Sequence, residues 1–162
     1  MAILTLTDEA DLRSGTNAAD IIRGLDGADT LYGLSGHDRV EGNDDDDLLY
    51  GGVGDDRMGS EHYEYGNDTF IGGVGNDIMN GGSGTDTLDY SQSTYSVRVN
   101  LDDETHTLGG STLSIYSAVD GLGGTDTIYY FENAWGGSSN DILLGSWDNN
   151  HLKGNAGNDT LW

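Results

Sequence analysis

The chain has 162 residues, of which 29 are acidic and 6 basic, and its formal net charge is −23. This balance excludes nucleic acid as a natural partner, since phosphate binding requires a basic surface, and it argues against anionic membrane surfaces. The absence of cysteine excludes a disulfide framework and zinc–thiolate sites. The absence of proline suits a chain of strands whose N–H groups all pair.

Residues 1–14 are predicted to form a lead-in strand and cap. ILTLT alternates apolar and polar residues, and DEADL then leads into the rest of the chain. The segment turns acidic at Asp8, so it does not resemble an N-terminal signal peptide. No apolar run in the sequence reaches transmembrane length, and no membrane insertion is expected.

A nine-residue period dominates the sequence from Gly15 onward. Units such as GGVGDDRMG and GGVGNDIMN begin with glycine, carry aspartate at the sixth position and an apolar residue at the eighth. Twelve units keep this register, in runs over residues 15–89 and 121–162. Their sixth-position residues are Asp20, Asp29, Asp38, Asp47, Asp56, Asp68, Asp77, Asp86, Asp126, Asp141, Asn150 and Asp159. Their eighth-position residues are Ile22, Leu31, Val40, Leu49, Met58, Phe70, Met79, Leu88, Ile128, Leu143, Leu152 and Leu161.

Each unit divides into a loop and a strand. The glycine-rich first half can adopt positive φ values, and the apolar residue with its two neighbours makes a minimal strand. Three residues bury little alone, so the units must stack, with two units forming a coil of about eighteen residues. Successive coils then pair as parallel strands and their eighth-position residues line a narrow core. The pattern therefore predicts an all-β solenoid.

The loops also carry the chemistry of a metal site. Glycines leave backbone carbonyls uncovered, and the sixth-position aspartate adds a carboxylate beside them. Ca²⁺ prefers six to eight such hard oxygen ligands. The alternative is a solenoid without metal, in which Asp and Asn only satisfy turns. That alternative would place many carboxylates close together with few bases to offset their repulsion.

The units resemble GGxGxDxUx, the calcium-binding nonapeptide of the RTX (repeats-in-toxin), or hemolysin-type, family. The resemblance implies a right-handed parallel β-roll in which units n and n+2 share an ion, with roughly five to eight Ca²⁺ ions in all. The implied pairs are Asp20–Asp38, Asp38–Asp56, Asp29–Asp47, Asp47–Asp68, Asp56–Asp77, Asp68–Asp86 and Asp141–Asp159. The aspartates at the sixth position, including Asp126, would be joined by carbonyl oxygens of Gly24, Gly27, Gly33, Gly36, Gly51, Gly54, Gly72, Gly75, Gly81 and Gly84.

Several units depart from the family pattern. Asp26 and Asp44 stand at the third position, where an aspartate can supply an extra ligand. Ala18 replaces a glycine, so the first site is expected to be imperfect. Unit 145–153, with Asp148 and Asn150 in place of Gly and Asp, is expected to bind weakly or not at all.

The unit over residues 60–71 has three extra residues. Because Asp68 and Phe70 keep the repeat register, the extra length is predicted to leave the loop as a bulge over residues 61–65. We expect that bulge to distort the ion site on its side of the roll.

Residues 90–120 interrupt the period and are predicted to be spacer strands within a single domain over residues 1–162. YSVRVNL alternates cleanly and places Val97, Val99 and Leu101 on one face. Aromatic residues gather here and in the second run, either to fill the core and edges of the spacer or as a sugar-stacking surface. They are Tyr90, Tyr95, Tyr116, Tyr129, Tyr130, Phe131, Trp135 and Trp147.

The sequence carries no recognised catalytic motif. The histidines, at positions 37, 62, 106 and 151, form no HExxH, and there is no GxSxG and no cysteine nucleophile. The many carboxylates fall in the predicted metal loops, where bound Ca²⁺ would lower their pKa values. We therefore expect no enzyme activity.

The resemblance implies a calcium-binding module of an exported bacterial protein, which folds on binding Ca²⁺ after type I secretion and stabilises or aids export of an attached protein. The chain stops at Trp162, at the end of a repeat, so we expect it to belong to a larger secreted polypeptide. One alternative is a module that recognises a polysaccharide or cell-surface glycan, as in RTX regions of alginate epimerases and adhesins. A remote alternative is an ice-binding face, for which the seventh-position threonines form an interrupted ladder.

Overall fold

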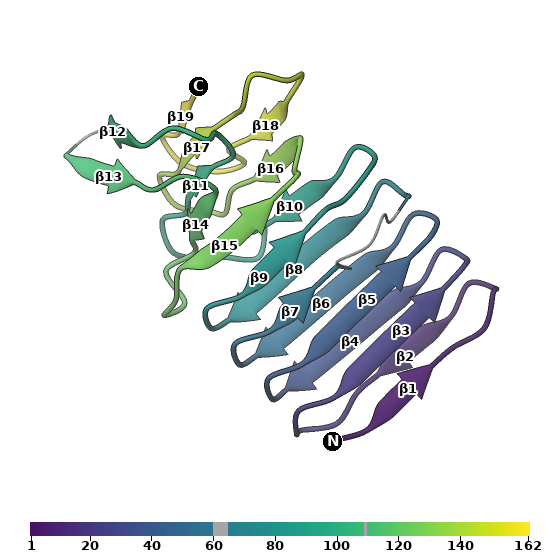
Figure 1. The fold of residues 1–162 in the computed structure, drawn as a ribbon. Helices are drawn as coiled ribbons and strands as arrows, with labels where there is room; N and C mark the ends of the chain where they lie inside the picture. Colours follow the sequence, from purple (N-terminus) through teal and green to yellow (C-terminus); the bar gives the residue numbers. More distant parts are fainter. Residues whose placement is uncertain (60–64, 109) are drawn as a thin grey trace.

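The computed structural model describes residues 1–59, 65–108 and 110–162, and among these none is helical. The described strands form two long sheets and one hairpin (Figure 1). In spatial order, the larger sheet contains β1 (Ile3–Thr5), β3 (Ile21–Leu25), β5 (Arg39–Asn43), β7 (Arg57–Met58), β9 (Ile78–Asn80), β15 (Asp126–Tyr129), β14 (Ser117–Val119), β11 (Arg98–Asn100), β17 (Ile142–Leu144) and β19 (Thr160–Leu161). The smaller sheet contains β18 (His151–Lys153), β16 (Asn133–Trp135), β10 (Thr87–Asp89), β8 (Thr69–Val74), β6 (Leu48–Val53), β4 (Thr30–Ser35) and β2 (Leu12–Ser14). The hairpin joins β12 (His106–Leu108) to β13 (Ser111–Leu113).

Each coil of the roll contributes one strand to each long sheet. Units alternate between the sheets, and a strand pairs in parallel with the strand two units away. Ile22 of β3 lies opposite Val40 of β5, and Leu31 of β4 lies opposite Leu49 of β6. The predicted parallel solenoid with two nonapeptides per coil is confirmed.

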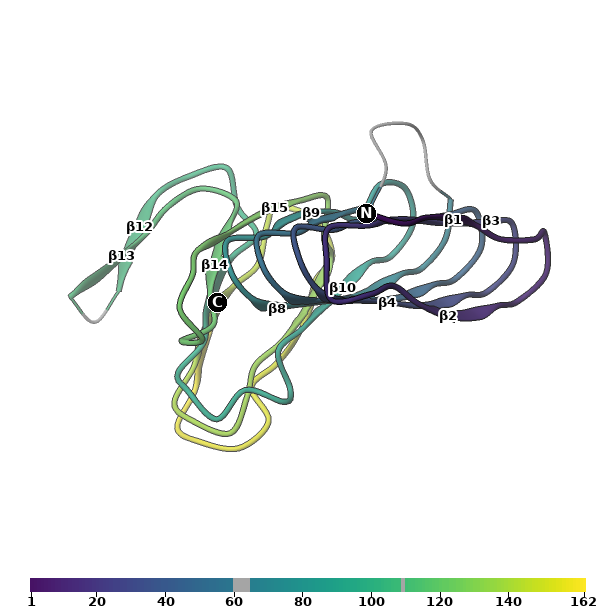
Figure 2. The same ribbon diagram turned by 90° about the horizontal axis from the view of Figure 1, so that it is seen from below.

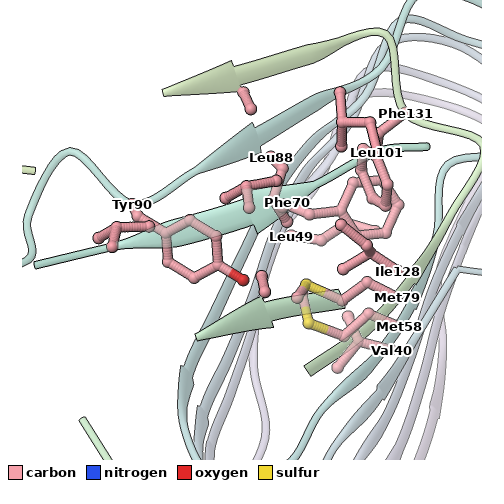
Figure 3. Packing of buried hydrophobic residues seen from close by; sticks show 14 of the residues in the cluster. Val40, Leu49, Met58, Phe70, Met79, Leu88, Tyr90, Leu101, Ile128 and Phe131 are labelled. Atoms are coloured by element: carbon pink, nitrogen blue, oxygen red, sulfur yellow. The ribbon is translucent and has the colours of Figure 1, made fainter. Parts of the chain in front are cut away.

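The core is a narrow layer between the two sheets. The eighth-position side chains enter it from both sides and are fully buried from Ile22 to Leu88. Figure 3 shows several of them in contact, among them Val40, Met58, Met79 and Ile128. Each such burial contributes about 1.5–3 kcal/mol, so the apolar row stabilises the stack along its whole length.

Residues 1–14 add a complete coil rather than the single strand expected. β1 pairs with β3, placing Leu4 opposite Ile22, and β2 pairs with β4, placing Arg13 opposite Leu31. The second half of this coil is therefore a degenerate unit with arginine at the eighth position.

The spacer extends the larger sheet and leaves the smaller one uninterrupted. β14 and β11 lie between β15 and β17; β14 is antiparallel to both β11 and β15. Val97, Val99 and Leu101 are buried, as predicted. Because β16 follows β10 directly in the smaller sheet, extra strands enter on one side only. The last coils consequently turn away from the line of the first array, and the β12–β13 hairpin projects beside them (Figure 2).

The long unit keeps its strand in register. Phe70 of β8 lies opposite both Leu49 and Leu88, so the inserted residues do not shift the core. The predicted bulge falls largely on residues 60–64, which lie outside the described residues, and Tyr65 is exposed.

The described part of the chain contains no helix of the length and apolarity needed to cross a bilayer.

Candidate metal centre

A ladder of sixth-position aspartates runs along both sides of the roll. The Oδ1 atom of a ladder aspartate accepts a hydrogen bond from the backbone N–H of a residue one coil earlier. That donor is Ala2 for Asp20 and Val97 for Asp141, and it is another aspartate in the pairs that follow. All seven pairs named from the sequence are joined in this way: Asp20–Asp38, Asp38–Asp56, Asp47–Asp68 and Asp68–Asp86 at 2.8 Å, Asp29–Asp47 at 2.7 Å, and Asp56–Asp77 and Asp141–Asp159 at 2.9 Å. The ladder continues across the spacer, where Asp77 donates to Asp126 at 3.0 Å.

The second carboxylate oxygen has no donor at four aspartates of the first array. The Oδ2 atoms of Asp29, Asp38, Asp56 and Asp77 are buried and accept no hydrogen bond. Burial raises the pKa of all four carboxyls, and it raises that of Asp56 and Asp77 to about 6. A buried carboxylate oxygen without a donor is costly, so these positions favour a bound cation or a proton.

The first-position glycines make room beside these oxygens. A Cβ added to Gly51 would lie 2.5 Å from the carbonyl oxygen of Gly72 and 2.7 Å from Oδ2 of Asp56. The same two oxygen types, one from the unit itself and one from the next coil, face the corresponding space at Gly24 and at Gly33. Any side chain there would occupy the space that the carboxylate and the carbonyl share.

The fourth-position glycines let neighbouring loops touch. Gly36, Gly54 and Gly75 have φ values of 137°, 138° and 147°, and a Cβ on Gly54 or Gly75 would collide with the carbonyl of the loop below. Only glycine adopts such a backbone without strain. The loops on each side therefore stack closely and bring their carbonyl oxygens into columns.

This donor set fits a hard cation such as Ca²⁺, which accepts mixed carboxylate and carbonyl ligands. Among the described residues, no three acidic or histidine side chains cluster closely enough to hold a metal by themselves. The carbonyl columns would therefore supply much of each shell, as expected from the glycine positions. The assignment of individual residues as Ca²⁺ ligands stays a prediction.

Other predicted ligands lie in different surroundings. Asp26 and Asp44 are exposed on their loops, away from the buried ladder. Oδ2 of Asp20 accepts hydrogen bonds from Thr16 N–H at 2.6 Å and from the Thr16 hydroxyl at 2.7 Å. Hydrogen bonds from the Ala2 backbone and from Thr16 lower the pKa of Asp20, so its carboxylate is stabilised by the protein itself.

Later units also supply their own donors. The Tyr90 hydroxyl donates to Oδ2 of Asp126 at 2.7 Å, and Gly137 N–H donates to Oδ2 of Asp141 at 2.7 Å. Asn150, expected to be a poor ligand, instead accepts Ser146 N–H at 2.7 Å.

The repeat pattern did not identify three acidic residues that lie near the predicted sites. Asp11 N–H donates to Oδ1 of Asp29 at 2.7 Å; its position nine residues before Asp20 was the available signal, hidden because Arg13 occupies the apolar position. Oε2 of Glu132 accepts Asp86 N–H at 2.8 Å, in a coil that lacks the glycine loop. Asp120, in the spacer, is 1% exposed, and its Oδ2 has no donor; no sequence pattern marks it.

Comparison with known proteins agrees with this arrangement. The family description "RTX calcium-binding nonapeptide repeat" matches four copies, over residues 14–49, 32–59, 64–91 and 131–162. These ranges cover well over half of the 162 residues and omit most of the spacer. A search of curated proteins found no match.

Proposed function

The chain belongs to the RTX calcium-binding nonapeptide-repeat family, and from this premise we propose that calcium binding between its stacked loops folds the module after export and stabilises the protein attached to it. The observation that carries the proposal is the row of buried Oδ2 atoms without donors, each beside a glycine that leaves room for an ion. The net charge of −23 supports it, since the roll needs cations to hold so many carboxylates together.

The proposed mechanism depends on the cost of stacking the coils. Where calcium is scarce, carboxylates of neighbouring coils repel one another and the chain stays open and exportable. Calcium, where bound, supplies the positive charge that offsets this repulsion. Each site formed only in the folded chain adds about 2.7 kcal/mol at a hundredfold excess of ligand over its dissociation constant. Since each coil contacts only its neighbours, folding should propagate cooperatively along the roll.

This role places the module outside the cell, in a larger polypeptide carried by a type I system. We propose no catalysis by the module itself: its ladder carboxylates are engaged in backbone hydrogen bonds and in the space beside the first-position glycines. Release of the attached protein into a calcium-rich medium would then coincide with folding.

Recognition of a glycan is the second candidate function, and one observation favours it. Tyr130 and Trp147 are exposed rather than packed in the spacer core. An ice-binding face has less support. Along the smaller sheet, Leu48 stands between Thr30 and Thr69 in the paired seventh positions and breaks the threonine ladder.

The test of calcium-driven folding is far-UV circular dichroism of the whole chain. We expect a disordered spectrum in EDTA and a strand spectrum in millimolar Ca²⁺. Mg²⁺ should substitute poorly, because it demands octahedral geometry and gives up water reluctantly. A full strand spectrum in EDTA at neutral pH would contradict the proposal.

A further inference from the structure

A cavity of about 430 Å³ opens where the spacer meets the last coils. Four segments line it: residues 101–103 after β11, Tyr116 before β14, residues 129–132 between β15 and β16, and residues 146–148 between β17 and β18. The volume lies within the range of small-ligand sites. The spacer therefore contributes to a concave surface beside the last coils.

Aromatic rings form much of this surface. The ring centroids of Tyr116 and Tyr129 are 5.9 Å apart, and those of Tyr129 and Tyr130 are 6.5 Å apart. Tyr130 is 68% exposed and Trp147 is 84% exposed, so neither fills the core. Phe131 is buried and lines the cavity from the core side. The cavity thus presents flat apolar faces to solvent at a cost that a bound ligand would offset.

Two of these tyrosines have unusual backbone conformations. Tyr116 and Tyr130 have φ values of 43° and 59°, in the left-handed region that bulky residues avoid. The other described non-glycine residues with positive φ occupy turn positions of the nonapeptide loops. They are Leu25, Leu34, Asn43, Asp45 and Asn155. Strained backbone outside the repeats collects at binding sites, and here both examples line one cavity.

The lining is acidic. It contains Asp102, Asp103, Glu132 and Asp148, and no lysine or arginine is among its described residues. His106 lies 2.9 Å from Asp102 and offsets that charge in part when protonated. Aromatic faces and carboxylates both attract cations, and the same carboxylates would repel an acidic sugar such as a uronate.

We propose that this cavity binds a saccharide that carries protonated amines. The apolar CH face of a sugar ring would pack on Tyr130 and Trp147. Its hydroxyl and ammonium groups would donate hydrogen bonds to the carboxylates. A simple cationic side chain would use the charge but not this alternation of rings and hydrogen-bonding groups. The inference rests on the cavity and is independent of how calcium folds the roll.

The test is calorimetric titration of the full chain in millimolar Ca²⁺ with three probes: a glucosamine tetramer, an N-acetylglucosamine tetramer and tetralysine. The glucosamine tetramer should bind about tenfold more tightly than its uncharged N-acetylated counterpart. Added salt should narrow this difference, because it screens the carboxylates.

Matched variants locate the binding. Trp147→Ala should weaken binding of the glucosamine tetramer about tenfold, because it removes a stacking ring. Tyr95→Ala removes an aromatic side chain that is 55% exposed and does not line the cavity, and should change nothing. The double variant Asp103→Asn, Asp148→Asn should bind both tetramers alike, whereas Asp8→Asn should behave as the parent. Circular dichroism in the same buffer would confirm that every variant is folded.

Each other outcome overturns the inference. Equal binding of the two tetramers by the parent chain would show a neutral-sugar site, and tighter binding of tetralysine would show a peptide site. Binding that survives Trp147→Ala would be adsorption to the acidic surface elsewhere. No binding of any probe would show that the cavity is not a site for amine-bearing ligands.

Discussion

At Asp29, Asp38, Asp56 and Asp77 of the first array, the second carboxylate oxygen is buried without a donor, whereas at Asp126 and Asp141 in the later coils the protein supplies one. Asp38 and Asp56 show the first arrangement, and Asp126 and Asp141 show the second. Both regions keep the same hydrogen bond through Oδ1. The backbone ladder therefore persists whether Oδ2 accepts a hydrogen bond from an N–H or O–H group or has no donor.

The second loop position accounts for part of this difference. In units whose Oδ2 has no donor, that residue is left-handed: Leu25, Leu34, Gly52 and Gly73 have φ values of 86°, 79°, 114° and 101°. In the units of Asp20, Asp141 and Asn150, its N–H instead donates to the carboxylate or amide oxygen of the same unit, from Thr16, Gly137 and Ser146. In the four units named first, a left-handed residue at the second position accompanies an Oδ2 atom without a donor. Calcium dependence should thus be concentrated in the first array.

The largest effect should come from neutralising the carboxylates whose Oδ2 atom has no donor. Asp38→Asn or Asp56→Asn removes a charged oxygen from a loop that serves the sites on both sides of it. We expect a loss of up to about 5 kcal/mol in the calcium-saturated free energy of unfolding, the contribution of two sites, and a higher calcium midpoint. Urea denaturation over a calcium series measures both. Asn150→Ala is the matched control and should leave the calcium midpoint unchanged; equal midpoints for all three variants would contradict the sharing of ions between stacked units.

The next largest effect should come from filling the space beside one first-position glycine. In Gly51→Ala, the added Cβ would meet both the Gly72 carbonyl and the Asp56 carboxylate closer than 3.0 Å. We expect a cost of about 1–3 kcal/mol from overpacking and a weaker calcium response. Val53→Ala, in the same loop but exposed, is the control. If both variants titrate with calcium as the parent does, the space beside Gly51 is not part of a site.

A smaller effect is expected from removing the hydrogen-bond donor to an Oδ2 atom that the protein satisfies. Tyr90→Phe removes the donor to Asp126 and leaves a buried oxygen without a partner, at a cost of about 1–3 kcal/mol. The variant should also need more calcium to fold its later coils, because Asp126 would then resemble the aspartates whose Oδ2 atom has no donor. Thermal unfolding at several calcium concentrations tests this, with Tyr95→Phe as the control. An unchanged calcium requirement would show that the hydroxyl does not substitute for a cation.

The smallest effect should come from protonation of the buried carboxylates, which changes the stability of the metal-free roll. Burial raises the pKa of Asp56, Asp68 and Asp77 to about 6 and that of Asp126 to about 7 in the folded chain, above the ordinary value of 3.8. The folded metal-free form therefore binds protons more tightly than the unfolded form. Its stability is greatest below the unfolded pKa and is lost as the pH rises through 6 to 7.

We expect the chain in EDTA to gain strand signal on acidification from about pH 8 to about pH 5. Circular dichroism over this range is the measurement. The gain should be smaller than that produced by calcium, since a proton neutralises one carboxylate and links no carbonyl oxygens. A spectrum that does not change with pH would show that carboxylate charge does not control folding.

Much of this arrangement could be predicted because the repeat encodes it locally. The eighth-position residues predicted the core from Ile22 to Leu88, and the spacing of the aspartates predicted which of them stack. The sequence left open whether the clustered aromatics fill the core and edges of the spacer or form a stacking surface. Packing holds for Tyr90 and Phe131, which are buried, and fails for Tyr130 and Trp147, which are exposed.

The sequence by itself determined the parallel solenoid, the two-unit coil and the row of aspartates, because each follows from a period that every unit repeats. Only the tertiary structure decided which carboxylates have an Oδ2 atom without a donor, since the donors to Asp126 and Asp141 come from outside the pattern or from one loop conformation. It also decided that Asp11 and Glu132 join the ladder, and that the spacer strands β14 and β11 enter one sheet and leave a cavity beside it. These contacts involve residues that depart from the repeat or lie outside it, so a nine-residue period carries no information about them.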